Sequence, residues 1–281
     1  MKTTIITIAV LLLGYLTSCT NNKTVALQYA IQDVESVKYD LTYSQNSVAK
    51  MSEEPMSAQY SVSIPLELSS HQNNSVVKSE ITIPKTTVKL TFPSGQQTLD
   101  TRNLKNIRLD LSYTSDGNNK EIVSLNDSMV IDFGEMLGGT LDWEYLFKYV
   151  TPNLPGTQVK KGDVWNESLL LQKIEGGSKI DATIVFSHKI SGFDEIDGRR
   201  CAVIESKINS NIDDAFELMA LPWTIGAVLS GDMIWHFDYQ QGLIVNLKIE
   251  EKSSGEIIEA GGEMSATYDQ TTIIELNLIN K

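Results

Sequence analysis

The sequence predicts a mainly β protein: an antiparallel curved sheet, a half-open barrel or a sandwich, with one or two short helices. Apolar and polar residues alternate over stretches such as 58–69 and 232–239, and a period of two is typical of half-buried strands. Asp-Gly pairs at 116–117 and 197–198 separate such stretches, and this dipeptide is a strong hairpin signal. Apolar residues at helical spacing are concentrated in one short stretch near the middle of the chain.

The first half of the chain contains five alternating stretches, over residues 38–44, 58–69, 76–92, 106–114 and 121–125. We expect each stretch to form a strand with one buried face. Pro65 lies opposite the apolar residues of its stretch. Because proline lacks the amide hydrogen that a strand ladder needs, this position predicts an edge strand or a bulge.

A helix is predicted over residues 141–150, where Thr140 can cap the first turn and Pro152 ends the helix. Four apolar residues there share one helical face: Trp143, Leu146, Phe147 and Val150. Residues 152–156 then predict the connection between a β-rich N-terminal half, 25–151, and a β-rich C-terminal half, 156–281. These halves are either two domains or two parts of one sheet.

The second half contains six alternating stretches, over residues 164–173, 180–191, 201–208, 232–239, 243–250 and 264–278. Residues 212–221, which end at Pro222, predict a short helix or a covering loop. An antiparallel sheet that curves around a helix would hide the apolar faces of both. Such a sheet can also enclose an apolar cavity.

The N-terminus has the order of a secretory signal: Lys2, an apolar run over residues 5–13, and small residues before Cys19. Leu16-Thr17-Ser18-Cys19 resembles the lipobox of bacterial lipoproteins, and the run is too short to span a bilayer comfortably. The resemblance implies a signal peptide over 1–18, acylation of Cys19 and a lipidated tether over 19–24. By analogy with sorting rules, the absence of an acidic residue in 20–23 favours the outer membrane, facing the periplasm.

Three motifs follow in order in the second half: Gly-Asp-Val-Trp at 162–165, a hairpin motif over 196–204 and Phe-Asp-x-x-x-Gly at 237–242. In this order they resemble a family of uncharacterised bacterial envelope lipoproteins, over about residues 154–249. The resemblance implies no catalytic residues. A looser likeness is to the lipoprotein-carrier fold, a half-open β-barrel with a helical lid over an apolar cavity.

Charge and cysteine content limit the partners. The chain has a formal net charge of −13 and no basic cluster, which argues against nucleic acid and against charge-driven docking on anionic headgroups. We therefore expect membrane attachment through the lipid alone. The chain has two cysteines, Cys19 and Cys201, so acylation of the first leaves no intramolecular disulfide. We expect Cys201 to be a buried, inert thiol.

His236 is the best-placed catalytic candidate, because it shares a predicted strand face with Asp232 and Asp238. Two carboxylates beside a histidine could orient it as a base or contribute to a metal site. The alternative is a solvated face with mixed charges. The chain has no G-x-S-x-G, H-E-x-x-H, P-loop or G-x-G-x-x-G motif, which disfavours the common hydrolase, zinc-protease and nucleotide-binding classes. No cofactor or bound metal is predicted.

Five large apolar residues outside the predicted strands are candidates for lining a ligand cavity: Trp143, Phe147, Phe216, Met219 and Trp223. They form either a lid over a cavity or simply the core of the fold. Separately, Asp127-Ser128-Met129 resembles the acceptor of a bacterial envelope O-glycosylation system.

Two functional hypotheses follow. The first is a lipid-anchored, non-catalytic envelope protein that binds an apolar ligand in a β-cavity or another envelope protein. The alternative is an envelope hydrolase or metal-dependent enzyme centred on His236.

Overall fold

The structure is a computed structural model of the 281-residue chain. It describes residues 23–29, 34–51, 55–73, 76–84, 87–92, 95–99, 107–124, 130–132, 140–175, 178–218, 221–262 and 264–279. Cys19, Ser128 and Met219 lie outside these residues, and only the backbone of Phe216 is described.

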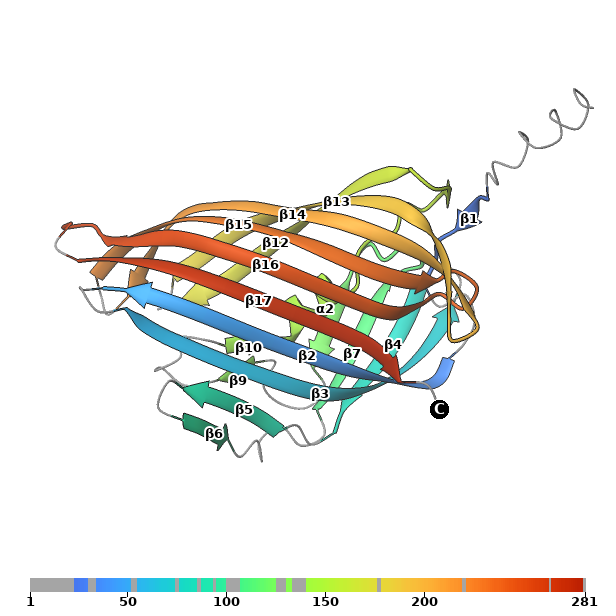
Figure 1. The fold of residues 1–281 in the computed structure, drawn as a ribbon, viewed down its shortest axis with the longest axis horizontal. Coiled ribbons are helices and arrows are strands. Elements are labelled where there is room, and N and C mark those ends of the chain that lie inside the picture. The colour runs from blue at the N-terminus through green and yellow to red at the C-terminus, as the bar shows by residue number, and fades with distance from the viewer. Residues whose placement is uncertain are drawn as a thin grey trace, which may run out of the picture.

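Within this part of the chain, 13 strands form one antiparallel sheet that curves around its own inner face (Figure 1). The strands of the N-terminal half are β2 (Val34–Lys50), β3 (Met56–Asn73), β4 (Val76–Ile83), β5 (Thr87–Phe92), β6 (Gly95–Leu99), β7 (Ile107–Thr114) and β8 (Glu121–Ser124). Those of the C-terminal half are β12 (Val164–Glu175), β13 (Ser178–Ile196), β14 (Arg199–Leu218), β15 (Leu221–Asp238), β16 (Leu243–Glu259) and β17 (Ser265–Ile279).

The sheet is open. Its order is β12-β13-β14-β15-β16-β17-β2-β3-β4-β7-β8, with β5 and β6 attached beside β3. The end strands β12 and β8 are not neighbours in this order. The predicted mainly β, antiparallel, curved architecture is confirmed. The two halves meet where β17 pairs with β2, for example at Leu278 and Tyr39.

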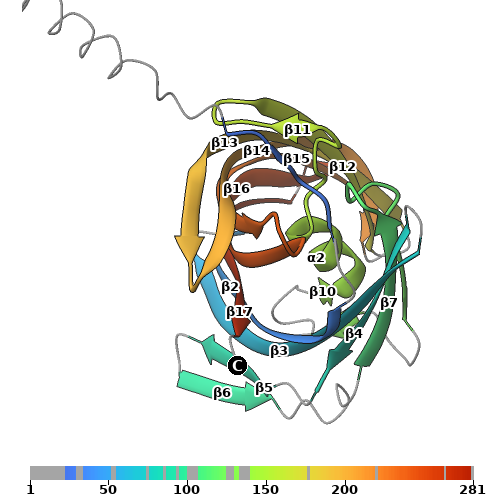
Figure 2. The ribbon, with the colours of Figure 1, turned by 90° about the vertical axis from the view of Figure 1, so that its right-hand side faces the viewer.

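Two short strand pairs and one helix complete the described structure. β1 (Val25–Ala26) pairs with β11 (Gln158–Val159), and β9 (Val130–Asp132) pairs with β10 (Thr140–Asp142). The helix α2 (Trp143–Val150) lies within the curve of the sheet (Figure 2). Its predicted apolar face is buried: Trp143, Leu146, Phe147 and Val150 are at most 3% exposed. Burying each such side chain contributes about 1.5–3 kcal/mol.

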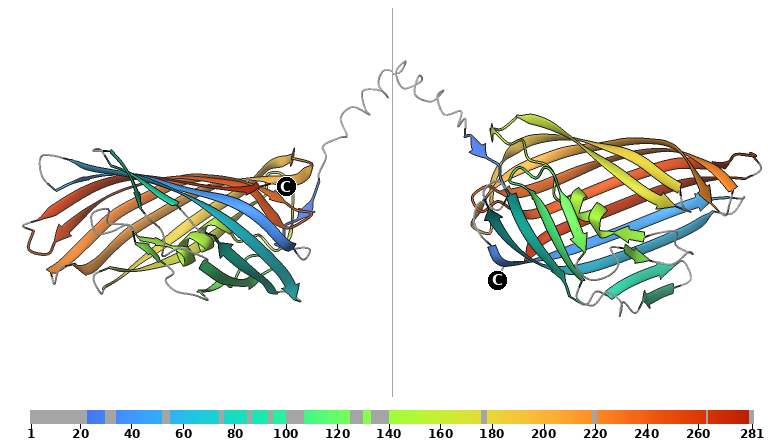
Figure 3. Two further views of the ribbon diagram at one scale, coloured as in Figure 1. Left: turned by 90° about the horizontal axis from the view of Figure 1, so that it is seen from below. Right: turned by 180° about the vertical axis from the view of Figure 1, so that it is seen from behind.

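Along the long strands, the inner face of the sheet has two zones. Near α2 it is fully packed, as Leu247 and Ile249 on β16 show at 1% and 0% exposure. Further along β16, alternate inward positions are part-buried from Ser253 onward. Here the long strands extend beyond α2 (Figures 1 and 3). We call the inward positions from Glu251 to Glu259 on β16, with their register neighbours on β14, β15, β17 and β2, the distal inner face.

Several predicted elements need correction. Residues 76–92 form two strands rather than one: β4 ends at Ile83, directly before Pro84, and β5 begins at Thr87. Proline lacks the amide hydrogen that would continue a strand ladder. The helix begins at Trp143 rather than Leu141, since residues 140–142 pair with β9 instead. The described residues of the stretch 212–221, namely 212–218 and 221, form neither a helix nor a covering loop: they belong to the β14–β15 hairpin, in which Ile212 pairs with Ala227.

Local turn chemistry agrees with the sequence. Asp197 and Gly198 have φ angles of 51° and 76° in the β13–β14 hairpin, the left-handed pair that a two-residue hairpin turn requires. The other Asp-Gly pair connects β7 and β8. At Pro65, β3 changes its outer partner from β5 to β4, so the change of partner falls at the residue that lacks an amide hydrogen.

Candidate functional site

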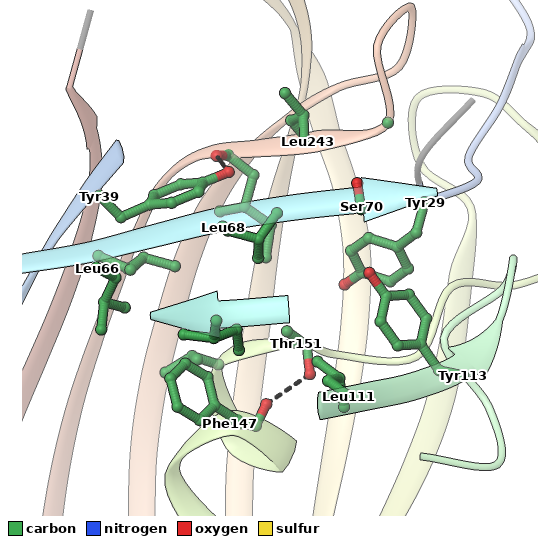
Figure 4. A pocket seen from close by; sticks show the side chains of 15 residues that line it. Tyr29, Tyr39, Leu66, Leu68, Ser70, Leu111, Tyr113, Phe147, Thr151 and Leu243 are labelled. Atoms are coloured by element: carbon green, nitrogen blue, oxygen red, sulfur yellow. Dashed lines mark hydrogen bonds between the residues drawn. The ribbon is translucent and has the colours of Figure 1, made fainter. Parts of the chain in front are cut away.

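An apolar cavity of about 50 Å³ lies between the C-terminal end of α2 and the sheet (Figure 4). Strands of both halves contribute to it, and the β15–β16 turn contributes Gly242. Its apolar lining consists of Leu66, Leu68, Ile81, Leu111, Phe147, Val150, Leu243, Ile244 and Leu276.

Three tyrosines, Ser70 and Thr151 supply hydroxyl groups at the cavity wall, and the Thr151 hydroxyl donates to Phe147 O at 2.5 Å (Figure 4). The Tyr29 hydroxyl donates to Pro152 O at 2.7 Å, the Tyr39 hydroxyl donates to Ile244 O at 3.0 Å, and the Tyr113 hydroxyl lies 3.3 Å from the hydroxyl of Ser79. Burial raises the pKa of all three tyrosines, so their hydroxyls stay neutral.

Ser70 differs from the tyrosines. It is 1% exposed, it lines the cavity, and its Oγ has no hydrogen-bond partner among the described residues. A buried hydroxyl without a partner costs about 1–3 kcal/mol. The cavity wall therefore contains one polar group that a bound atom would satisfy.

The size of the cavity limits what it can hold. At about 10–15 Å³ per water, it has room for roughly four waters or for a small apolar group. Pockets for drug-sized ligands are larger, about 300–1,000 Å³. Apolar walls disfavour water, and engineered apolar cavities stay dry and bind apolar molecules. The arrangement suits a small apolar group or the end of an apolar chain.

Of the residues predicted to line a cavity, those on α2 lie at or beside this cavity, whereas Phe216 and Trp223 of the β14–β15 hairpin lie elsewhere on the sheet. Phe147 lines the cavity, whereas Trp143 is fully buried behind it, with ring centroids 6.0 Å apart. Trp223 lies on the distal inner face, where it pairs in register with Phe216. The cavity itself joins residues from many strands, and no local sequence pattern predicts that meeting.

His236 and its neighbouring aspartates each have separate partners. His236 Nδ1 lies 2.6 Å from Asn246 Oδ1 across the β15–β16 pair. Asp232 is exposed and forms an ion pair with Lys207. Among the described residues, no three His, Cys, Asp or Glu side chains gather as a metal site.

Asp238 is buried and organises the β15–β16 turn. Its Oδ1 accepts the Gln240 and Gln241 amide hydrogens at 2.9 and 3.1 Å, and Arg199 Nη1 lies 3.3 Å from its Oδ2. Asp238 therefore acts as a turn-stabilising acceptor and is not directed towards His236.

A buried polar network around His188 was not predicted from the sequence. His188 Nδ1 lies 2.7 Å from Ser206 Oγ, and its Nε2 lies 3.4 Å from Glu167 Oε2. Glu167 Oε1 lies 3.4 Å from Lys120 Nζ, and Glu167 Oε2 accepts the Asn153 amide hydrogen at 2.7 Å. The signal for this network was present, because Glu167 shares the face of its strand with apolar neighbours.

Charge within the network is balanced. Burial alone would raise the pKa of the Glu167 carboxyl, but the His188 hydrogen bond, the Lys120 charge and the Asn153 amide hold it below its usual value. Burial lowers the pKa of Lys120, and the Glu167 carboxylate offsets part of this effect. The ion pair is thus held by several hydrogen bonds, as buried pairs require.

The order Ser206–His188–Glu167 is that of a nucleophile, a base and an orienting carboxylate. However, Ser206 is 3% exposed and His188 is 1% exposed. The Ser206 hydroxyl also accepts the Trp235 indole N–H at 3.3 Å. A substrate carbonyl cannot reach the hydroxyl unless the sheet opens, so the network is structural in this conformation.

Cys201 has the environment of an inert thiol. It is fully buried and free, and burial raises its pKa to about 11. Reactive cysteines instead have lowered pKa values and exposed sulfur atoms. The predicted burial of Cys201 is confirmed.

No helix in the described part of the chain is long and apolar enough to cross a membrane.

Comparisons with known proteins identify no family. No protein-family model and no curated protein matches the chain. Solved structures with some similarity include OccK2 (OpdF) of Pseudomonas aeruginosa, at 7% identity and a TM-score of 0.30, with 90% of this chain and 100% of that chain covered. A Vibrio parahaemolyticus domain named for outer membrane lipoprotein sorting has 9% identity and a TM-score of 0.21, over 86% and 83%. A DUF1329 family protein from Desulfovibrio piger has 7% identity and a TM-score of 0.18, over 84% of each chain. At these TM-scores, the likenesses carry no conclusion about function.

Proposed function

We propose that the protein is a lipid-anchored protein of the bacterial envelope that binds a small apolar group or chain end, without catalysis, in the cavity beside α2. The cavity is the observation that carries the proposal. Apolar side chains from both halves of the sheet surround it, and the Ser70 hydroxyl on its wall lacks a partner among the described residues. That hydroxyl would bind one polar atom of the ligand.

The N-terminal sequence supports the anchor. The lipobox-like residues before Cys19 support acylation of this cysteine. The absence of an acidic residue from positions 20–23 supports the outer membrane, facing the periplasm, as the location. Lipid attachment at one cysteine would then place the whole folded part of the chain in that compartment.

The position of Lys23 connects the anchor to the cavity. Its Nζ lies 5.0 Å from the Phe193 ring centroid and 4.8 Å from that of Tyr239. Tyr239 begins the β15–β16 turn, and Gly242 of this turn lines the cavity. Three residues separate Cys19 from Lys23, and an extended residue spans at most about 3.6 Å, so their Cα atoms lie within about 14 Å. An acyl anchor on Cys19 would hold the cavity end of the molecule close to the bilayer.

The binding proposal is tested on protein purified from its own membranes. Native mass spectrometry, followed by organic extraction, should detect a stoichiometric apolar adduct on the folded protein. Leu68→Phe should abolish the adduct, because Leu68 lines the cavity and the larger ring would fill it. Leu169→Phe is the matched control, since Leu169 packs on the core outside the cavity. A clean mass without any adduct contradicts the proposal.

The anchor is tested by mass spectrometry of the N-terminal peptide. We expect a peptide that begins at Cys19 and carries acyl chains, and we expect Cys19→Ser to remove the acylation and the cleavage at this site. An unmodified Cys19 thiol in the membrane-derived protein would contradict the anchor.

A further inference from the structure

The distal inner face begins at a carboxyl group that lacks a partner. Glu251 follows the fully buried Ile249 on the inward side of β16. It is 6% exposed, and its Oε1 has no hydrogen-bond partner among the described residues. An unpaired buried charge is costly, so natural proteins usually supply such a group with a cation or hydrogen-bond donors.

The neighbouring strand leaves room for this side chain. Glu251 pairs in register with Gly231 on β15. A Cβ atom at position 231 would lie 3.1 Å from Glu251 Cγ and 2.6 Å from Glu250 O. The glycine therefore allows the Glu251 side chain to lie against the sheet. On the other side, Glu251 pairs with the uncharged Thr272 of β17.

The ionisable side chains that face inward in this zone, among the described residues, are all acids. Asp214 on β14 and Glu259 on β16 share the inner face with Glu251, and Glu259 Oε2 is also buried, with no hydrogen-bond partner in the described part of the chain. The inward positions of β14–β17 and β2 from Glu251 outward contain no lysine or arginine among the described residues. Basic side chains of these strands, such as Lys207 and Lys252, are exposed on the opposite face.

An apolar strip runs beside the carboxyls. Inward residues of β15 beyond Gly231 are Leu229, Ala227, Ile225 and Trp223. Ala227 and Trp223 are buried, whereas Leu229 and Ile225 are part-buried. An inner face with carboxyl groups beside a part-exposed apolar strip is complementary to a molecule that has one cationic end and an apolar body.

We propose that the distal inner face binds an amine-bearing amphiphile, with the ammonium group at Glu251 and the apolar body along the strip from Leu229 to Trp223. This site is separate from the α2 cavity and does not depend on it. The ammonium group would donate to the unpartnered Oε1. Such a charge-assisted hydrogen bond is stronger than a neutral one.

Proton linkage gives the site a distinctive pH dependence. Burial raises the pKa of Glu251 to about 8, so the carboxyl is protonated at neutral pH before the amine binds. Among the described residues, the other titratable groups at the inward positions of these strands, from the level of Tyr43 outward, are Asp214, Glu259, Tyr43 and Tyr268, and none is a cation. Because an ammonium group binds the carboxylate, affinity should rise with pH up to about 8 and level off above it, with a slope approaching about tenfold per pH unit.

The test uses dansylcadaverine, an aromatic group on a primary-amine tail, and its N-acetylated derivative, which has no charge. The full chain in nonionic detergent is titrated with each probe, and energy transfer from tryptophan reports only probe that is bound near the protein. We expect dansylcadaverine to bind at least tenfold more tightly than the acetylated derivative. Glu251→Gln should abolish that preference.

Two matched variants make the result specific. Glu250→Gln removes the adjacent carboxyl on the exposed outer face and should leave binding unchanged. Leu68→Phe fills the α2 cavity and should also leave it unchanged, so this proposal and the proposed function can fail separately. Three outcomes would each overturn the proposal. The wild type could bind both probes with equal affinity, Glu251→Gln could keep the preference for dansylcadaverine, or Leu68→Phe could lose binding.

Discussion

At the scale of single residues, two buried glutamates of this sheet have pKa values shifted in opposite directions. Glu167 has His188, Lys120 and an amide hydrogen as partners, so its pKa is lowered despite burial. Among the described residues, no donor binds Glu251 Oε1, and burial raises the pKa of this carboxyl to about 8. A pKa shift between the folded and unfolded states makes the free energy of unfolding depend on pH. Titration of Glu167 should therefore change stability at acidic pH, and titration of Glu251 should change it between about pH 4.5 and about pH 8.

Glu251→Gln should stabilise the protein at alkaline pH. The folded state holds the Glu251 proton more tightly than the unfolded chain, whose pKa is near 4.5. Stability is therefore lost as pH rises from about 4.5 to about 8, with a slope approaching about 1.4 kcal/mol per pH unit. Urea unfolding at pH 5, 7 and 9 should show this loss in the wild type and a weaker one in Glu251→Gln. If the free energy of unfolding varied with pH identically in the wild type and in Glu251→Gln, the raised pKa of Glu251 would be contradicted.

Glu167→Ala should destabilise the fold by about 3–5 kcal/mol, because it leaves the buried Lys120 ammonium group without its carboxylate partner. In the wild type, the lowered pKa of Glu167 gives stability that is present above about pH 4.5 and is lost as the solution becomes more acidic. Urea midpoints measure the first effect. The double variant Glu167→Ala with Lys120→Met is the control, since removing both charges should recover part of the loss.

At the scale of elements, the turn between β7 and β8 connects three segments that are far apart in the sequence. Tyr29 N–H donates to Ser115 O, and Leu154 N–H donates to Asp116 O, each at 2.7 Å. At Gly117, whose φ is +80°, a Cβ atom would lie 2.8 Å from the Tyr29 ring. The glycine thus meets two requirements, the left-handed backbone and the close approach of Tyr29.

Gly117→Ala should therefore lower stability by about 1–3 kcal/mol, from backbone strain together with displacement of the Tyr29 ring. Gly162→Ala is the matched control: its φ is +94°, and nothing lies within 4 Å of the added Cβ atom. It should show the strain alone. Thermal unfolding of both variants measures the difference, and equal losses would contradict a role for the Tyr29 contact.

Most strands could be predicted, because alternation of apolar and polar residues directly reports a half-buried strand. The β14–β15 hairpin was missed at its tip, where Phe216, Leu218 and Leu221 did not indicate a turn. The α2 cavity could not be predicted, since it depends on which strands become neighbours. For the same reason the partners of Glu167 could not be predicted, although its position between the apolar Trp165 and Leu169 on one strand face indicates a buried carboxyl. Only the register shows that His236 faces Asn246 and that Glu251 faces Gly231.

At the scale of the whole molecule, one sheet contains a packed zone around α2 and a distal zone that is less buried. Backbone amides should therefore differ in protection along the same strands. We expect residues 243–250 of β16 to exchange much more slowly than residues 252–259, because local opening costs less where few apolar contacts are lost. Hydrogen–deuterium exchange with mass spectrometry measures this, and equal rates in the two halves of β16 would contradict the two-zone description.

The pairing of β17 with β2 has a consequence for how the chain folds. These neighbouring strands near the centre of the sheet come from opposite ends of the sequence. Until the last strand is in place, β2 and β16 each present an open edge of unpaired N–H and C=O groups, a common starting point for aggregation. Contacts of such large sequence separation also slow folding. When β17, a strand of 15 residues, pairs with β16 and β2, it covers both of these edges. A chaperone that shields the two edges would therefore act before β17 pairs.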